Sequence, residues 1–169
     1  MQYNGAMNQA HQARDRSQRF LFEEADIRGE IVQLDRCYRD IVAIHQYAPG
    51  VSRLLGEFLA ASVLLATTLK FHGKLVLQAR SNGQLPLLMA ECDDALRVRA
   101  IARGAQQATA ERFDQLLAGG QLAITVDPER GQRYQGIVPL AEDSLAHSLD
   151  AYFRPSGQLG TRFWLSASD

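Results

Sequence analysis

The most apolar stretch of this chain is FLAASVLLATTL, residues 58–69. It lies inside a longer run of helical spacing, which predicts one helix from Ser52 to Lys70. Charged side chains occur near its start, at Arg53 and Glu57, but from Phe58 onward every face of the helix is apolar. A helix that is apolar all round has to be covered on all sides. We therefore expect this helix in the middle of the domain, between other layers.

Upstream of this helix, the sequence predicts extended chain and a shorter helix. The pattern is strand-like from Phe20, where Phe20, Phe22 and Glu24 alternate with Leu21, Glu23 and Ala25, and a second apolar run covers residues 31–34. Gly29, between the two, is typical of a bulge that lets one long strand bend. The predicted helix is capped by Asp35, runs from Arg36 to Tyr47 and is ended by Pro49 and Gly50.

Downstream of the central helix, the sequence predicts antiparallel sheet. The turn at Ser81-Asn82-Gly83 separates two alternating segments, and an Asn-Gly pair in that position indicates a hairpin. The predicted strands are 74–80, 85–92, 96–103, 122–126, 133–140 and 161–166, and the predicted helices are 111–118 and one capped by Asp143 that ends near Phe153. Strands and helices do not alternate regularly. The predicted fold class is therefore α+β, with antiparallel sheets packed around a buried central helix in β/α/β layers.

Length, composition and charge exclude several classes of protein. The 169 residues correspond to one domain, with 46% hydrophobic residues, 22% charged residues and a net charge of −1. This balance gives no overall electrostatic attraction to nucleic acid or to an anionic membrane. Residues 1–18 lack the apolar core of a secretory signal, so we interpret them as a disordered leader or as residues added for expression. The stretch 58–69 is shorter than the roughly 20 residues that span a bilayer, and we expect a cytoplasmic protein.

No pattern in the sequence points to catalysis or to metal binding. The four histidines, His11, His45, His72 and His147, are scattered, and there is no C-x-x-C or H-x-x-x-H pair. Acidic neighbours of Cys92 would raise its thiol pKa, and we interpret both Cys37 and Cys92 as structural. A P-loop and a G-x-S-x-G motif are absent. We predict no catalytic residue, no metal ligand and no cofactor in this chain, and hence no enzyme.

A basic stripe is predicted on one of the strands. Arg97, Arg99 and Arg103 share strand parity, whereas the residues between them are small or apolar. Such a stripe could hold RNA or an acidic peptide. It is also what an ordinary solvated face looks like, because no exposed aromatic residue is interleaved for base stacking.

Two predicted strands carry more apolar residues than one covered sheet face requires. Segments 74–77 and 85–89 are apolar at both parities, although a sheet between a buried helix and water needs only one apolar face. The surplus is covered by a second layer of the same domain, or it belongs to a binding surface. The candidate surface residues are Leu75, Leu77, Leu85, Leu87 and Met89.

Several stretches together resemble the N-terminal domain of the 33-kDa heat-shock protein family, the redox-regulated bacterial chaperones. The most specific is ITVDPERGQRYQGIV at residues 124–138. The other stretches are RFLFE (19–23), IRGE (27–30), LLGEFLA (54–60), TLKF (68–71), RAIAR (99–103), LDAYF (149–153) and Thr161-Arg162. The match runs from about Arg19 to the end, and the resemblance identifies residues 19–169 as the N-terminal chaperone domain.

The resemblance implies an ATP-independent holdase that binds unfolding proteins under oxidative stress and forms a homodimer. In the family, a C-terminal module with C-x-C and C-x-x-C binds one zinc ion when reduced and forms disulfides when oxidised. That module is absent here, and Cys37 and Cys92 match none of its ligands. A linker that covers the sheet in the family is also missing, so the resemblance implies a domain without its switch.

Three hypotheses therefore follow from the sequence. The first is a chaperone domain that binds unfolded clients, or a second copy, through apolar sheet surface at the five candidate positions. The second is an enzyme of unrecognised type that uses Arg97 or Arg103 to clamp an anion. The third is an RNA-binding module that uses the same arginine stripe, although we expect no specific nucleic-acid partner.

Overall fold

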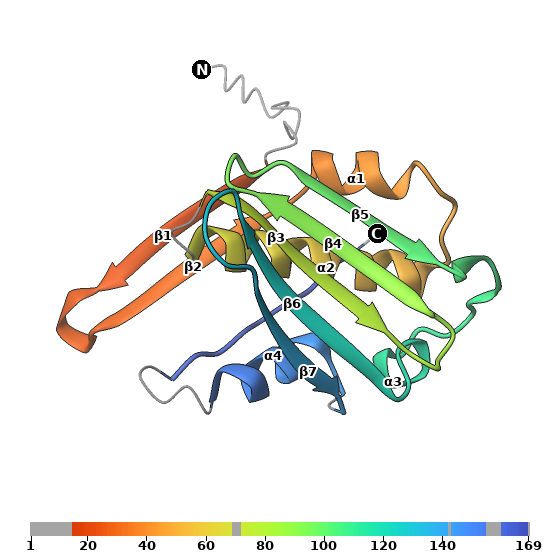
Figure 1. The fold of residues 1–169 in the computed structure, drawn as a ribbon. Helices are drawn as coiled ribbons and strands as arrows, with labels where there is room; N and C mark the ends of the chain where they lie inside the picture. The colour runs from red at the N-terminus through yellow and green to blue at the C-terminus, as the bar shows by residue number, and fades with distance from the viewer. Residues whose placement is uncertain (1–14, 69–71, 142, 155–159, 169) are drawn as a thin grey trace, which may run out of the picture.

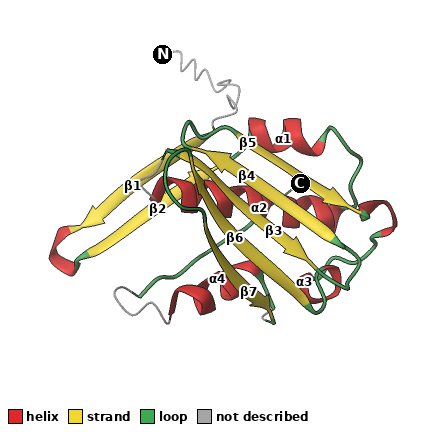
Figure 2. Cartoon of the chain, viewed as in Figure 1, coloured by secondary structure: helices red, strands yellow, loops and turns green. Residues whose placement is uncertain are grey.

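The computed structural model describes residues 15–68, 72–141, 143–154 and 160–168. Two antiparallel sheets and a long helix make up most of this part of the chain (Figures 1 and 2), which confirms the predicted α+β class. The larger sheet has the strand order β5-β4-β3-β6-β7. Its strands are β3 (Gly73–Arg80), β4 (Leu87–Asp93), β5 (Val98–Arg103), β6 (Gly120–Pro128) and β7 (Tyr134–Leu140). The predicted three-strand meander and the following hairpin are therefore confirmed.

Helix α2 (Pro49–Thr68) lies at the centre of the domain, as its all-round apolarity predicts. It packs against β3, β4 and β5 on one side and against β2 and α1 on the other. The helix begins at Pro49, earlier than predicted, because proline is well suited to the first turn of a helix. Pro49 and Gly50 thus start this helix instead of ending the previous one. The predicted end at Lys70 lies outside the described residues.

One face of the larger sheet forms the core with α2. Alternate residues of β3 and β4 point toward the helix, and Leu75, Leu77, Leu88 and Cys92 are fully buried there. Helix α4 (Leu145–Phe153) packs against β7 on the same side, with Leu145 and Leu149 fully buried. Figure 1 shows both helices behind the sheet.

The smaller sheet is a two-stranded ribbon that projects from the domain (Figure 1). It consists of β1 (Arg16–Phe22) and β2 (Ile27–Gln33), joined by a single 3-10 turn, η1 (Glu23–Ala25). The strands pair without interruption, so the bulge predicted at Gly29 is wrong. The ring of Phe20 lies over Gly29 from the opposite strand and occupies the space a side chain would need. Residues 16–18, expected in the leader, belong to β1, and residues 1–14 lie outside the described residues.

Helix α1 (Arg36–Val42) is shorter than the predicted 36–47, and the residue that caps its N-terminus lies far upstream in the sequence. Asp35 occupies the N-cap position, but its side chain pairs with Arg39 at 2.8 Å instead of capping. The carboxylate of Asp15 accepts hydrogen bonds from the backbone N–H groups of Asp35 (2.6 Å) and Cys37 (3.0 Å). A residue that precedes the ribbon therefore satisfies the helix N-terminus after the ribbon.

The segments between β3 and β6 differ from the predicted tight turn and longer helix. Asn82 and Gly83 belong to a longer connection that ends where β4 begins at Leu87. Leu85 lies in this connection and is fully buried, and its N–H bonds to the carbonyl of Leu116 at 2.9 Å. Two short helices complete the region, η2 (Ala105–Gln107) and α3 (Phe113–Leu116). The hairpin that Asn-Gly indicated is present, since β3 pairs with β4, but its loop is longer than a tight turn and is held by backbone hydrogen bonds to the chain around Leu116.

The C-terminal part also departs from the sequence-based expectation in two places. Ser144, not Asp143, caps α4 by accepting a hydrogen bond from the N–H of His147. Residues 160–168 form an extended segment without sheet pairing, so the strand predicted at 161–166 is wrong. The buried carboxylate of Asp150 holds this segment, because it accepts hydrogen bonds from Phe163 N (2.7 Å) and from Arg162 (3.2 Å).

Substitution of Leu65 by aspartate tests the central position of α2. Leu65 is 5% exposed, and an unpaired buried charge there should lower the free energy of unfolding by roughly 3–5 kcal/mol. The measurement is urea unfolding, with Thr68→Asp near the exposed end of the same helix as the control. If the Leu65→Asp variant unfolds at nearly the same urea concentration as the parent, α2 is peripheral and the layered fold is wrong.

The pH dependence of stability should report on Glu57 in the same helix. Burial raises the pKa of Glu57 from 4.5 to about 7, and the charge of Arg53 acts in the opposite direction. A raised pKa means that the folded protein retains a proton that the unfolded chain releases, so the stabilising effect is full below pH 4.5 and is lost as the pH rises through 7. The melting temperature of Glu57→Gln relative to the parent should therefore increase between pH 5 and pH 8. An unchanged difference across this range contradicts the burial of the carboxyl.

Candidate functional site

The face of the larger sheet that points away from α2 is the candidate functional site, here called the outer face. In Figure 1 it is the side of the sheet turned toward the viewer, and no helix or strand among the described residues crosses in front of it. The alternation that buries Leu75 and Leu77 places Val76 and Gln78 on the outer face. Its partly or fully exposed apolar residues are Val76, Leu87, Met89, Ile101, Ala123 and Ile137.

Four of these apolar residues lie in one row across the strands, here called the apolar band. The register pairs Ile101 with Met89, Met89 with Gln78, Gln78 with Ala123, and Ala123 with Ile137. One row of neighbouring side chains therefore crosses all five strands, with Gln78 as its only polar member. At about 4.8 Å between strands, the row is ~19 Å long. It ends at Ile137, which is 50% exposed.

The rows on either side of the apolar band are mixed. On one side, Leu87 lies between Arg103 and Arg80, which are both exposed. On the other side, Val76 lies between Glu91 and Thr125. The hydroxyl of Thr125 accepts a hydrogen bond from the amide of Gln135 at 2.9 Å, so its polar atom is satisfied inside the face. The outer face is thus an apolar centre with a polar border, which is typical of an interaction surface.

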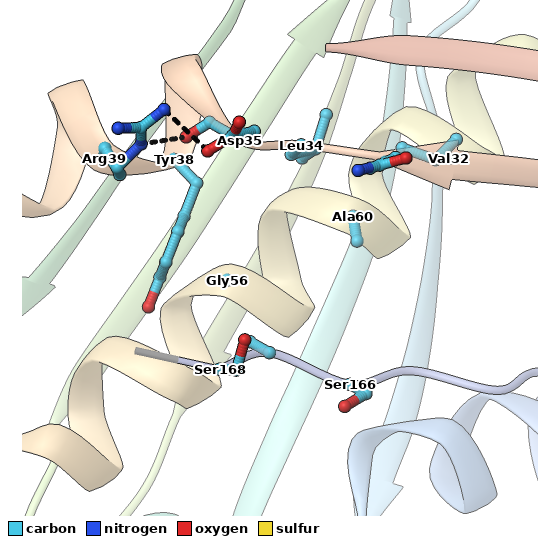
Figure 3. A pocket seen from close by; sticks show the side chains of 11 residues that line it. Val32, Leu34, Asp35, Tyr38, Arg39, Gly56, Ala60, Ser166 and Ser168 are labelled. Carbon is cyan, nitrogen blue, oxygen red and sulfur yellow. Dashed lines mark hydrogen bonds and ion pairs between the residues drawn. The ribbon is translucent and has the colours of Figure 1, made fainter. Parts of the chain in front are cut away.

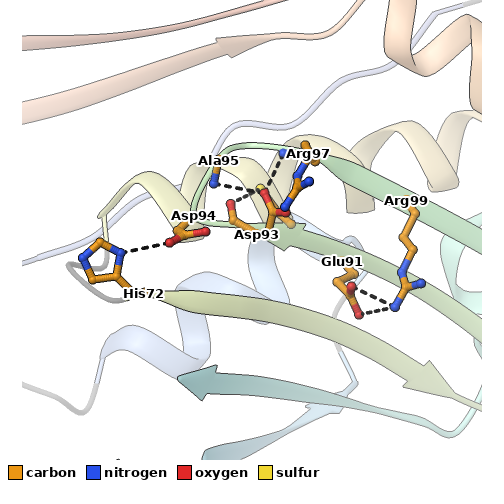
Figure 4. A network of polar contacts seen from close by, with 8 residues as sticks. His72, Glu91, Asp93, Asp94, Ala95, Arg97 and Arg99 are labelled. Atoms are coloured by element: carbon orange, nitrogen blue, oxygen red, sulfur yellow. Dashed lines mark hydrogen bonds and ion pairs between the residues drawn. The ribbon is translucent and has the colours of Figure 1, made fainter. Parts of the chain in front are cut away.

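The predicted arginine stripe does not form a free cationic surface (Figure 4). Arg99 lies on the outer face, and its guanidinium is 2.9 Å from a Glu91 oxygen, which raises the pKa of Arg99. Arg97 precedes β5, and its Nε is 2.7 Å from Asp93. Hydrogen bonds from Arg97, first from its backbone N–H, hold the pKa of Asp93 below its usual value. Two of the three predicted cations are therefore already neutralised by carboxylates, and only Arg103 forms no ion pair among the described residues.

The five apolar candidates divide between the core and the outer face. Leu75, Leu77 and Leu85 are fully buried, so the prediction that they lie at a surface is wrong. The first two pack under α2, and Leu85 is covered through its loop pairing with the chain around Leu116. Leu87 and Met89 lie partly exposed on the outer face, where their side chains are accessible to a binding partner.

Sequence reasoning missed four members of the outer face. Val76, Ile101, Ala123 and Ile137 were not among the candidates, although each has the parity of Met89 once the register is known. The sequence of the predicted strand 133–140 did contain an apolar residue, Ile137, at the parity opposite to that of Gly136 and Val138. The choice of face could not be made from that alternation alone, because both parities of the strand contain apolar residues.

The two cysteines lie in different elements, and the surroundings of each make its thiol unreactive. Cys92 is fully buried in β4, and burial, followed by the charge of Asp93, raises its pKa to about 12. Cys37 is half-buried in α1, and burial, followed by the charge of Asp15, raises its pKa to about 12 as well. Thiols in this state are poor nucleophiles and poor metal ligands. The described residues contain no group of three or more His, Cys, Asp or Glu side chains that could hold a metal ion, so they do not fit the zinc site of the resembling family.

A cavity of about 390 Å³ lies away from the outer face, between β2, α1, α2 and residues 166–168 (Figure 3). Backbone and small side chains form much of its wall, including Gly56, Ala60 and Ser166. Its charged residues, Asp35 and Arg39, are paired with each other at 2.8 Å. The cavity therefore brings together no nucleophile and base, and it gives no support to the enzyme hypothesis.

Among the described residues, α2 is the single helix with the length and apolar composition of a membrane span. Most of that helix is buried inside the domain, as the core helix of a globular fold is. The apolar stretch of 58–69 is thus part of a 20-residue helix whose apolar surface is covered by protein.

Comparisons with known proteins agree on one family. The family model for Hsp33 protein matches residues 15–169. The chain is 53% identical over 155 residues to the 33 kDa chaperonin of Pseudomonas paraeruginosa, and 52% identical over 155 residues to that of Azotobacter vinelandii, covering 90% of this chain in each case. It spans about half of these relatives, 52% of their length. The fold is similar to the crystal structure of the 33 kDa chaperonin from Thermotoga maritima, with a TM-score of 0.70 and 18% identity over 83% of this chain and 50% of that one.

Alkylation kinetics should show that neither thiol is poised for chemistry. With both pKa values raised to about 12, iodoacetamide at pH 7.5 should modify the native protein far more slowly than the denatured chain, in which the thiols are solvated. The half-buried Cys37 should react before Cys92. The modification is measured by mass spectrometry. Rapid modification of either native thiol would contradict the environment described for it.

Proposed function

Since this chain belongs to the Hsp33 protein family, we propose that it is a chaperone domain that binds unfolding proteins and prevents their aggregation without ATP. The outer face of the sheet is the binding surface in this proposal. The single observation that carries it is the apolar band, which crosses the sheet with no covering element among the described residues. The proposal also includes a cytoplasmic location and a homodimer.

The apolar band is suited to clients that are recognised by their exposed apolar side chains and not by a particular sequence. Its four apolar residues come from four different strands, and Gln78 of β3 completes the row between Met89 and Ala123, so a continuous backbone ladder holds an open surface. Burial of an apolar side chain contributes roughly 1.5–3 kcal/mol when it is complete, and contacts on an open face are only partial. Several weak contacts of this kind give reversible binding, which a holdase needs.

The polar border of the outer face contributes selectivity in this proposal. On the Val76 side of the apolar band, Glu91 is shared between Arg99 at 2.9 Å and Lys74 at 3.8 Å. On the Leu87 side, Arg80 and Arg103 are exposed and form no ion pair with another described residue. The border is therefore cationic on the Leu87 side, which favours clients with acidic residues beside their exposed apolar ones. The RNA-binding hypothesis has little support here, because the described strand residues of the outer face include no aromatic side chain on which a base could stack.

Regulation by oxidation belongs, in this proposal, to a C-terminal module of the longer relatives, which holds the zinc ion and its cysteines. The described residues of this domain do not fit a zinc site, and Cys37 and Cys92 lie in separate elements, α1 and β4. The domain therefore binds clients in the same way under reducing and oxidising conditions.

Light scattering of a heat-labile client tests the binding surface. The double substitution Met89→Gln/Ile101→Thr removes two adjacent apolar side chains of the apolar band and should reduce protection several-fold without changing the melting temperature by more than a few degrees. The control is Ile44→Thr, which removes an apolar side chain that is 70% exposed outside the outer face. Equal protection by all three proteins would place client binding elsewhere.

Peroxide should not change the protection. The parent and the Cys37→Ser/Cys92→Ser variant are compared with and without oxidant, and equal protection is expected in all four conditions, because both thiols are shielded. Protection that appears only after peroxide, and is lost in the double variant, would make these cysteines a switch. No protection in any condition would mean that this domain does not bind clients by itself.

A further inference from the structure

Two tyrosines at one edge of the larger sheet meet at their hydroxyl groups. Tyr134 is the first residue of β7, which is an edge strand, and Tyr152 lies near the end of α4. Their hydroxyl oxygens are 2.7 Å apart, so one phenol donates a hydrogen bond to the other. The contact therefore joins the edge strand of the sheet to the helix that packs behind it (Figure 1).

The strand and helix periods place both rings on the same side of the sheet. Tyr134 has the parity of the buried Val138, so its side chain points to the side of the sheet on which α4 lies. Tyr152 follows the buried Leu145 and Leu149 by seven and three residues, which places it on the helix face that packs against β7. The two tyrosines are therefore on the opposite side of the sheet from the apolar band.

Gly136 provides the space in which the Tyr152 ring lies against β7. A Cβ at this position would overlap the Tyr152 hydroxyl, so a larger residue would push the ring away from Tyr134. The Tyr152 ring also packs edge-to-face against Phe153, with 5.1 Å between the ring centroids. Tyr152 is thus held in place, whereas Tyr134 is 57% exposed and accessible to small molecules.

The chemistry open to such a pair is one-electron oxidation. Burial, followed by the hydrogen bond with Tyr134, raises the pKa of Tyr152 to about 12, so this phenol is protonated at neutral pH. A phenol that loses one electron and its proton becomes a phenoxyl radical, whose unpaired electron is shared with the two ring carbons beside the oxygen-bearing carbon. Because Tyr134 is exposed, an oxidant can reach it and water can take up its proton.

We propose that Tyr134 and Tyr152 form a modification site, at which a one-electron oxidant joins them into a dityrosine cross-link within one chain. Two oxidant molecules are reduced by one electron each, and two protons pass to water, which leaves one phenoxyl radical on each residue. A carbon–carbon bond then forms between a Cε atom of each ring. The hydrogen on each of these carbons moves to the oxygen of the same ring, so both hydroxyls are restored and the product has lost two hydrogen atoms in total.

The hydrogen-bonded pair already resembles the cross-linked product. In dityrosine the two hydroxyls lie side by side, each on the carbon next to the new bond, as neighbouring hydroxyls do here. The rings meet at their hydroxyl ends, so the exposed Tyr134 ring has only to turn to bring its Cε atom against that of Tyr152. Such proximity gives the partner ring a high effective concentration, which favours reaction within one chain over reaction between chains.

This inference does not rest on the proposed function. The site lies on the opposite side of the sheet from the apolar band, so cross-linking should leave the protection of clients unchanged. Peroxide alone is a two-electron oxidant and does not supply the one-electron step, so the two oxidation experiments are independent. The cross-link ties β7 to α4 across 18 residues of sequence, which restricts the unfolded chain and should raise the melting temperature by a few degrees.

Dityrosine fluorescence after brief photochemical oxidation tests the site. The native protein is illuminated with a ruthenium tris-bipyridyl complex and persulfate, and the fluorescence of the monomer band is measured on a denaturing gel. The yield per chain should be independent of protein concentration and several-fold higher than for the urea-denatured chain, because the fold holds the two phenols together. Peptide mass spectrometry should find Tyr134 joined to Tyr152, with the loss of two hydrogen atoms.

Four variants locate the reaction, and melting curves show whether each of them is folded. Tyr134→Phe and Tyr152→Phe each remove one hydroxyl and should abolish the product within one chain, since phenylalanine forms no phenoxyl radical. Gly136→Ala keeps both phenols but displaces the Tyr152 ring, so the yield should fall several-fold. The matched control is Tyr47→Phe, which removes a phenol that accepts a hydrogen bond from the N–H of Ala102 and should keep the parent yield.

The results that would overturn the proposal are distinct from those expected. They are a product that persists in Tyr134→Phe or Tyr152→Phe, a product found only between chains, and equal yields from native and denatured protein. An unchanged yield in a folded Gly136→Ala variant would also overturn it, because the contact between the two hydroxyls would then not direct the reaction.

Discussion

Helix α2 is stable only where protein covers all of its faces, because residues 58–66 carry apolar side chains around the whole circumference. The larger sheet covers one side, and β2, α1 and the segment 160–168 cover the other. The close packing is visible at Gly56, where an added Cβ would lie 2.8 Å from the Cβ of Ala167. The larger sheet thus has one face packed against the helix, and its outer face is left for binding.

Successive side chains of a strand point to opposite faces, so burying one face of the larger sheet against α2 exposes the other face. Once Leu75 and Leu77 face α2, Val76 and Gln78 must point the other way, and the register extends the same choice to all five strands. The apolar band is therefore a consequence of how the core is filled, combined with apolar residues at positions where water would favour polar ones. Apolar side chains are also exposed on the smaller sheet, at Phe20, Phe22, Ile27 and Ile31, while Arg19 on the opposite face of the ribbon contacts the end of α2.

Most of the architecture could be predicted from the sequence, because hydrophobic period and turn residues are local signals. The helix around 58–69, the meander and the later hairpin were of this kind. The assignment of faces was not, because segments 74–77 and 85–89 are apolar at both parities, so Leu75, Leu77 and Leu85 could not be distinguished from Leu87 and Met89. Long-range partners were also out of reach. The pairing of Arg99 with Glu91 depends on strand register, and the unpaired segment 160–168 is held by Asp150 through hydrogen bonds that no pattern indicates.

The segments that cover α2 are synthesised at different times. Its two sides are closed by segments far apart in the chain, with β2 before the helix and Phe163, Leu165 and Ala167 more than 90 residues after its end at Thr68. A ribosome adding ~5–20 residues per second needs roughly 5–20 s to make that stretch. During this time one side of a strongly apolar helix stays open to solvent. A nascent chain of this protein is therefore, for several seconds, in the same state as the unfolding proteins that we propose it protects.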